Sequence, residues 1–240
     1  MSRPTVRIPL ITLLLGALLA AGCKSAPTEE PPDYGLAAEQ ASLAARQKFY
    51  DLLLEIRPES IYDLINAENN LESDARKQLK PLVKEAENLA DKAMKVDPDD
   101  VRGYLAKSDA LYLNAVCNGS TTSFFCGLKR KVRKYYKKAK AINETYGQGS
   151  AFRLESRYLL HVRWPIRDPE LSERAAWRAA DLAPQSGPNM LALGDIQWMR
   201  GKRIEAIRTW KSAATARPGD SGIDYDAREL ALRRLHFAVE

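Results

Sequence analysis

The sequence is poor in the residues that enzymes and metal proteins use most. Its 240 residues include two histidines and three cysteines, and neither His161 nor His236 has a cysteine or carboxylate at metal-ligand spacing. The GxSxG, HExxH and Walker-loop patterns are absent, as is a GxGxxG pattern leading into a helix. These shortages argue against a catalytic centre, so we expect no catalytic residue, no metal site and no cofactor.

Strand patterns are missing as well. β-Branched residues never alternate with polar ones over a useful length, and strong helix formers dominate from Gly35 onward. The chain is 45% hydrophobic and 28% charged, which excludes a disordered chain, a collagen-like chain and a disulfide-dense miniprotein. The composition therefore predicts one α-helical domain or a short helical array.

No apolar run is long enough for a transmembrane helix, which needs roughly 20 residues. The longest run, residues 8–21, follows a short basic segment with Arg3 and Arg7 and precedes small residues. This order is typical of an export signal peptide. Removing it takes away two positive charges and no negative one, so the formal charge falls from +6 to +4.

The end of the apolar segment, residues 19–23 (LAAGC), resembles the lipobox of bacterial lipoproteins. The resemblance implies cleavage between Gly22 and Cys23, and lipid attachment at Cys23 by more than one chain. Lys24 stands where an aspartate marks inner-membrane retention in such lipoproteins, so the resemblance implies the outer membrane, facing the periplasm. The alternative is a plain secretory signal with an incidental cysteine.

The chain is therefore divided into three parts. Residues 1–22 form the predicted signal peptide, and residues 23–34 form a polar, proline-rich tether that starts at the lipid-bearing cysteine. Residues 35–240 form the predicted α-helical domain. Within it we expect helices over 36–56, 61–66 and from Leu71, with Pro81 kinking or breaking the third.

Four of the predicted helices end alike. Each carries an alanine, then an apolar residue one turn later, then a helix stop, at Ala93/Pro98, Ala139/Glu144, Ala179/Pro184 and Ala213/Pro218. The last two prolines are 34 residues apart, and the earlier spacings are 46 and 40 residues. A period of 34 residues is that of the tetratricopeptide repeat (TPR), a pair of antiparallel helices.

The final unit, residues 187–218, resembles the TPR pattern most closely. The matching residues are Leu193, Gly194, Ala206, Trp210, Ala213 and Pro218. Two positions depart from the pattern, since Met190 stands where tryptophan is usual and Gln197 where tyrosine is usual. Small residues at Gly194 and Ala206 would let the two helices approach, while Trp210 fills the gap between them. The resemblance implies an all-α, TPR-like solenoid of antiparallel helix pairs with a C-terminal capping helix at 222–238. The alternative is a generic helical bundle whose periods agree by chance.

Cys117 and Cys126 lie in the unit with the longest spacing, where we predict an inserted loop. An exported protein meets an oxidising compartment, so we predict that these two cysteines form a disulfide. The alternative, a redox or metal pair, does not suit eight intervening residues without a neighbouring histidine.

Residues 129–140 (KRKVRKYYKKAK) contain eight bases and no acid. Apolar residues recur there at helical spacing, so we predict a helix with one buried face and one cationic face. The cationic face is either an ordinary solvated surface or a patch for anionic lipid, peptidoglycan or an acidic partner. The export signal argues against nucleic acid. The patch consists of Lys129, Arg130, Lys131, Arg133, Lys134, Lys137, Lys138 and Lys140.

The first helices of TPR units line a concave groove in which partner segments dock. Aligning the units on Pro184 and Pro218 places aromatic and charged residues at groove positions, where such residues often dominate binding. The competing interpretation is that the aromatic residues belong to the core. The predicted groove residues are Arg102, Asp109, Tyr112, Arg157, His161, Trp164, Asp195 and Trp198.

These features favour a non-enzymatic function. The leading hypothesis is a membrane-anchored TPR-like lipoprotein that holds another envelope protein as a scaffold or assembly factor. The alternative is an accessory lipoprotein that loosely resembles the T components of TRAP transporters, which are thought to engage a solute-binding protein or a ligand.

Overall fold

The computed structural model describes residues 32–67, 71–125, 127–162, 167–217 and 223–239. Residues Asp33–Glu240 belong to one compact unit. Its described part consists of α-helices and the loops between them, without a strand. The helices are α1 (Tyr34–Glu55), α2 (Ile61–Asn66), α3 (Ser73–Val96), α4 (Val101–Phe125), α5 (Leu128–Ile142), α6 (Tyr146–His161), α7 (Pro169–Leu182), α8 (Gly187–Met199), α9 (Arg203–Thr215) and α10 (Ile223–Val239).

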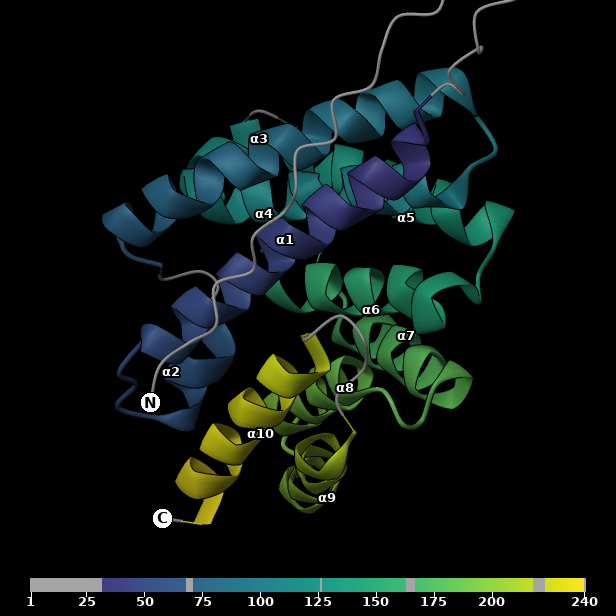
Figure 1. The fold of residues 1–240 in the computed structure, drawn as a ribbon. Coiled ribbons are helices and arrows are strands. Elements are labelled where there is room, and N and C mark those ends of the chain that lie inside the picture. The colour runs from purple at the N-terminus through teal and green to yellow at the C-terminus, as the bar shows by residue number, and fades with distance from the viewer. Residues whose placement is uncertain (1–31, 68–70, 126, 163–166, 218–222, 240) are drawn as a thin grey trace, which may run out of the picture. The chain divides into compact units, whose positions relative to one another are not determined.

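From α3 onward, helices that follow one another in the chain also pack against one another. The contacts run from α3 to α4, α4 to α5, α5 to α6, and so on to α9 and α10 (Figure 1). The prediction of an all-α, solenoid-like fold is therefore confirmed. The C-terminal helix α10 covers α8 and α9, as a capping helix should.

The four helix ends that share a sequence pattern also share a structure. Ala93, Ala139, Ala179 and Ala213 are all at most 2% exposed, at the ends of α3, α5, α7 and α9. In the first three, the alanine carbonyl accepts a hydrogen bond from the backbone N–H four residues on, at 2.9 to 3.2 Å. A small side chain at this position lets the last turn of each helix lie against its neighbour.

Close approach between α8 and α9 depends on Gly194. A Cβ placed there would lie 2.4 Å from Cδ1 of Trp210, which is completely buried. Leu193 and Ala206 are buried beside them, at 1% and 0% exposure. The interpretation of these residues as the packing centre of the final helix pair is thus confirmed.

Two local expectations need correction, because the third helix is not broken at Pro81 and the loop predicted after Cys117 is not a loop. Helix α3 runs from Ser73 to Val96 without a break, although Pro81 lies inside it. The expected loop after Cys117 is largely helical, since α4 continues to Phe125 with non-helical backbone angles only at Gly119. Gly119 has a positive φ of 73°, which glycine adopts without a steric cost, so the chain changes direction there and resumes a helix.

Helix α1 contacts both the beginning and the end of the array. It packs against α3 and α4, and also against α10 at the other end of the chain (Figure 1). In the figure it runs obliquely from the helices α3–α5 toward α2 and α10. Its residues Phe49, Tyr50 and Leu52 are at most 2% exposed and join the main core cluster.

Candidate functional site

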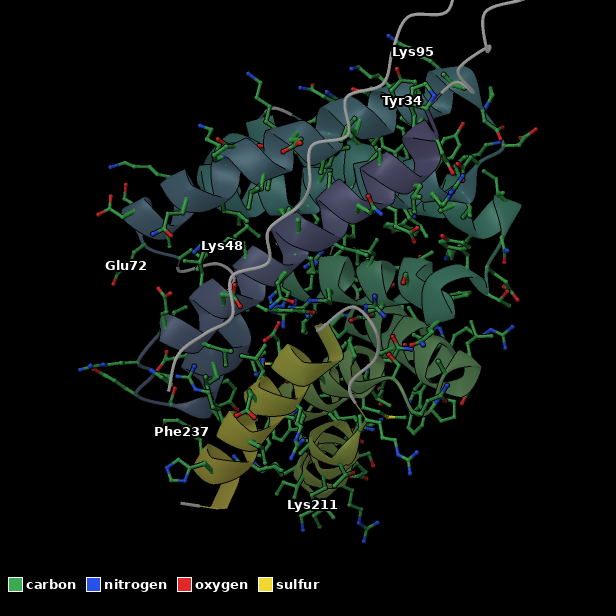
Figure 2. All side chains as sticks on the ribbon, viewed as in Figure 1. Tyr34, Lys48, Glu72, Lys95, Lys211 and Phe237 are labelled. Carbon is green, nitrogen blue, oxygen red and sulfur yellow. The ribbon has the colours of Figure 1, made fainter. Side chains whose placement is uncertain are left out.

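At α4 and α6 the predicted groove is covered by α1. Its positions lie on α4, α6 and α8, and buried side chains of α1 contact two of these helices. Ser42 Oγ donates a hydrogen bond of 3.0 Å to Oδ2 of Asp109 on α4. Arg157 of α6 donates one of 3.2 Å to the hydroxyl of Tyr50. Figure 2 shows side chains filling the space between α1 and its neighbouring helices. The groove is therefore occupied by a segment of the same chain.

The α4 residues predicted for the groove are held in this contact. Asp109 is 8% exposed, forms an ion pair with Arg46, and also accepts a hydrogen bond of 3.3 Å from Nε of Arg46. The Arg46 guanidinium lies 5.5 Å from the ring centre of Tyr112, which is 6% exposed. Arg102 is bound at the edge by Asp33 and Asp100, each at 2.9 Å.

The predicted groove residues of α8 belong to the core. Asp195, 6% exposed, accepts hydrogen bonds of 3.0 Å from Nε1 of Trp210 and 2.8 Å from Nη2 of Arg234. Trp198 is 7% exposed, and its ring centre lies 5.4 Å from that of Trp210. For this pair the competing interpretation as core was the better one, because α9 and α10 cover the side of α8 on which both lie.

The remaining two groove predictions are His161 and Trp164. His161 is the last residue of α6, and burial, with nearby Arg157, Arg167 and Arg234, lowers its pKa to about 3. An imidazole with such a pKa is neutral at physiological pH and carries no charge to a partner. Trp164 lies outside the described residues.

A cavity of about 90 Å³ remains between α1, α4 and α6. Four arginines line it, together with two carboxylates and an apolar wall that includes Leu105 and Leu154. The sequence analysis anticipated two of the arginines, Arg102 and Arg157. It missed Arg46 and Arg153, which come from α1 and α6. Arg46 stood out in the sequence only as one of few bases in an acidic stretch.

The cationic patch lies on α5 as predicted. None of the exposed bases on its cationic face forms an ion pair with a described acid. These bases are Arg130, Lys131, Arg133, Lys134, Lys137 and Lys138. Lys140 differs, because it is partly buried, pairs with Glu155 and lies 4.8 Å from the ring centre of Phe152. The side chain of Lys129 lies outside the described part.

The predicted disulfide is not supported. Cys117 is a free thiol, 8% exposed, on the helix that replaces the expected loop. Burial, opposed by nearby Lys80 and Arg76, raises its pKa to about 11. Such a thiol stays protonated near neutral pH and is a poor nucleophile. Cys126 and the predicted lipid-bearing Cys23 lie outside the described residues.

Other kinds of site were searched for among the described residues. None of their histidines, cysteines and carboxylates gather in groups that could hold a metal ion. None of the described helices is long and apolar enough to cross a membrane. Comparison of the sequence with family models and with curated proteins finds no match.

Proposed function

We propose that this protein is a TPR-like lipoprotein, anchored to the periplasmic face of a bacterial outer membrane through acylated Cys23. It acts without catalysis, as a scaffold or assembly factor for a cell-envelope complex. The anchor part of the proposal rests on the lipobox resemblance and on the proline-rich tether of residues 23–34. The repeat part rests on the 34-residue period and on the buried alanines that recur at the helix ends.

The observation that carries the binding role is the cationic face of α5. Six exposed bases lie on one helix of 15 residues, without ion pairs to described acids. The opposite face is anchored in the core through Val132 and Tyr136, each 1% exposed. A rigid helix with uncompensated charge attracts acidic surfaces, and the attraction falls as salt rises. An acidic envelope protein is therefore the proposed partner of this face.

The predicted groove is not the proposed partner-binding surface, although the sequence suggested that it was. Because α1 covers it at α4 and α6, a partner would have to displace a helix whose inner face, including Phe49, Tyr50 and Leu52, is buried. The outer faces of the second helices, and α5 above all, are open to a partner without any rearrangement.

The test is a crosslinking pull-down from envelopes with the lipidated full-length chain, identified by mass spectrometry. We expect a defined set of envelope proteins to be enriched. The triple variant Lys131→Gln, Lys134→Gln and Lys138→Gln should lose most of that enrichment, because half of the exposed charge is gone. The matched control changes three exposed lysines of α3, at Lys80, Lys84 and Lys95, and should retain it.

Two results would contradict the proposal. One is equal enrichment by wild type and the α5 variant, which would remove the role of the cationic face. The other is recovery of only lipid or peptidoglycan, which would make α5 a surface-binding element and leave no protein partner. Normal membrane fractionation of Cys23→Ser would separately contradict the lipid anchor.

The alternative function is an accessory lipoprotein similar to the T components of TRAP transporters. One observation favours it over a plain scaffold, namely the arginine-lined cavity between α1, α4 and α6. Recovery of a solute-binding protein in the same pull-down would support this alternative, whereas subunits of an assembly machine would support the leading proposal.

A further inference from the structure

The cavity beneath α1 is lined by arginines from three parts of the chain. Arg46 comes from α1, Arg102 from α4, and Arg153 and Arg157 from α6. Arg102 is engaged at the edge by Asp33 and Asp100. The other three guanidinium groups share the interior with the carboxylates of Glu39 and Asp109.

Both of those carboxylates already have partners. Asp109 is paired with Arg46 and accepts the hydrogen bond from Ser42. Glu39 accepts a hydrogen bond of 2.8 Å from the hydroxyl of Tyr146. Both acids of the cavity are therefore engaged by groups of the protein itself.

Arg46 is the clearest sign of an incomplete site. It is 7% exposed and lines the cavity, yet its Nη1 has no hydrogen-bond partner among the described residues. A buried donor without a partner loses its hydration and gains no hydrogen bond in return, and this cost is larger for a charged group. An oxyanion in the cavity would offer the missing acceptor.

The electrostatic potential in the cavity also favours an anion. Burial by itself would raise the pKa of Tyr50, but Arg157, Arg46, Arg153 and Arg234 together lower it. Burial lowers the pKa of both Arg46 and Arg157, and neighbouring arginines add to the effect. The potential around Tyr50 is thus positive enough to favour an anion.

We propose that this cavity is a binding site for a small organic oxyanion, a carboxylate or a phosphate ester, held by Arg46, Arg153 and Arg157. Guanidinium groups bind the paired oxygens of both anions in a bidentate way. The cavity volume of about 90 Å³ limits the ligand to a small molecule. Leu43, Leu105 and Leu154 line the same cavity and would contact its hydrocarbon part.

The experiment is calorimetric titration of the full-length chain in detergent, at fixed ionic strength, with butyrate and with inorganic phosphate as probes. We expect saturable binding of at least one probe with one site per chain. Butyrate binding alone would identify the ligand group as a carboxylate, and phosphate binding alone would identify it as a phosphate. Binding of both would establish the shared oxyanion chemistry.

Two variants test whether the cavity is the site at which the probes bind. Arg153 is only half-buried, so Arg153→Gln should fold, and we expect it to weaken binding at least tenfold. Ser150→Asp places a carboxylate beside Arg153, whose Nη2 donates to the Ser150 hydroxyl at 3.1 Å. This internal anion should compete with the probe and abolish the titration. The control Arg208→Gln removes an exposed arginine of α9 outside the cavity and should change the dissociation constant less than twofold.

The proposal is overturned if neither probe gives a saturable signal, or if Arg153→Gln and Ser150→Asp bind as the wild type does. Phosphate also stabilises proteins by exclusion from their surface, so a rise in melting temperature alone is not counted as binding. The result is independent of the pull-down, because no described residue of α5 lines the cavity.

Discussion

Single residues decide how closely the helices of this protein approach one another. Gly194 and Trp210 form the tightest such contact that the final repeat offers, with the indole ring lying where a Cβ would be. The Trp210 indole also donates its N–H to Asp195, which Arg234 binds from the other side. The sequence pattern of Leu193-Gly194 in α8 and Trp210 in α9 is thus explained by one close helix–helix contact, which a buried hydrogen bond accompanies.

Gly194→Ala should therefore destabilise the protein. The added methyl group would lie 2.4 Å from Cδ1 of a fully buried ring that cannot move into solvent. Overpacking of this kind costs about 1–3 kcal/mol, which exceeds the gain of about 1 kcal/mol in helix propensity. Urea denaturation followed by circular dichroism measures the difference. Ser212→Ala, on the exposed face of α9, is the control and should change stability by less than about 0.5 kcal/mol. A more stable Gly194→Ala would mean that α8 and α9 lie farther apart.

At the scale of helices, two kinds can be told apart by burial. Some are buried on most sides and stabilise the fold, while others bury one face and expose the other to solvent. Helix α8 is buried on almost every side, and α1 is buried wherever it crosses α4 and α10. Helix α5 buries one stripe and exposes its bases. Helix α3 is similarly one-sided, and Pro81 lies on its exposed side.

Replacing Pro81 should stabilise α3. Proline lacks the N–H that would bond to the carbonyl of Lys77, and its ring crowds that carbonyl. Pro81→Ala restores the hydrogen bond, so we expect the free energy of unfolding to rise by about 1–3 kcal/mol. The midpoint of urea denaturation is the readout, with Lys80→Ala on the same exposed surface as the control. An unchanged midpoint would show that the first two turns of α3 contribute nothing to the native state.

At the scale of the whole domain, α1 connects the beginning of the array to its end. Arg233 of α10 donates hydrogen bonds of 3.1 and 3.0 Å to the carbonyls of Leu53 and Leu54, which end α1. Gln47 of α1 donates another to Asp226 of α10. An open solenoid has only contacts between neighbours and can unfold unit by unit, whereas contacts between distant helices couple the units.

The domain should therefore unfold in one cooperative step. All four tryptophans lie between residues 164 and 210, so their fluorescence reports on the C-terminal half alone. Circular dichroism reports on every helix. We expect the urea curves from the two probes to coincide, as two-state unfolding requires. Arg233→Met should lower stability and separate the curves, because it removes the bonds between α10 and the end of α1. Two separate transitions in the wild type would show that the units are independent.

Local patterns in the sequence were sufficient for much of this structure. Helix propensity, apolar spacing and the alanines at helix ends depend on neighbours within a few residues, and they predicted α1, α2, α5 and α10 within a few residues of their bounds. The packing of Gly194 against Trp210 was also readable, because the two positions belong to one repeat. The lipid anchor and the export signal are sequence features of the same kind and stay predictions.

Only the tertiary structure decided what occupies the groove. Arg46 meets Asp109, 63 residues away, and Arg157 meets Tyr50, 107 residues away. No local pattern specifies such contacts, because they depend on the free energy of burying α1 against helices that form much later in the chain. The sequence determined the helices and their charged faces. The burial of α1 turned an expected docking groove into a closed interior with an arginine-lined cavity.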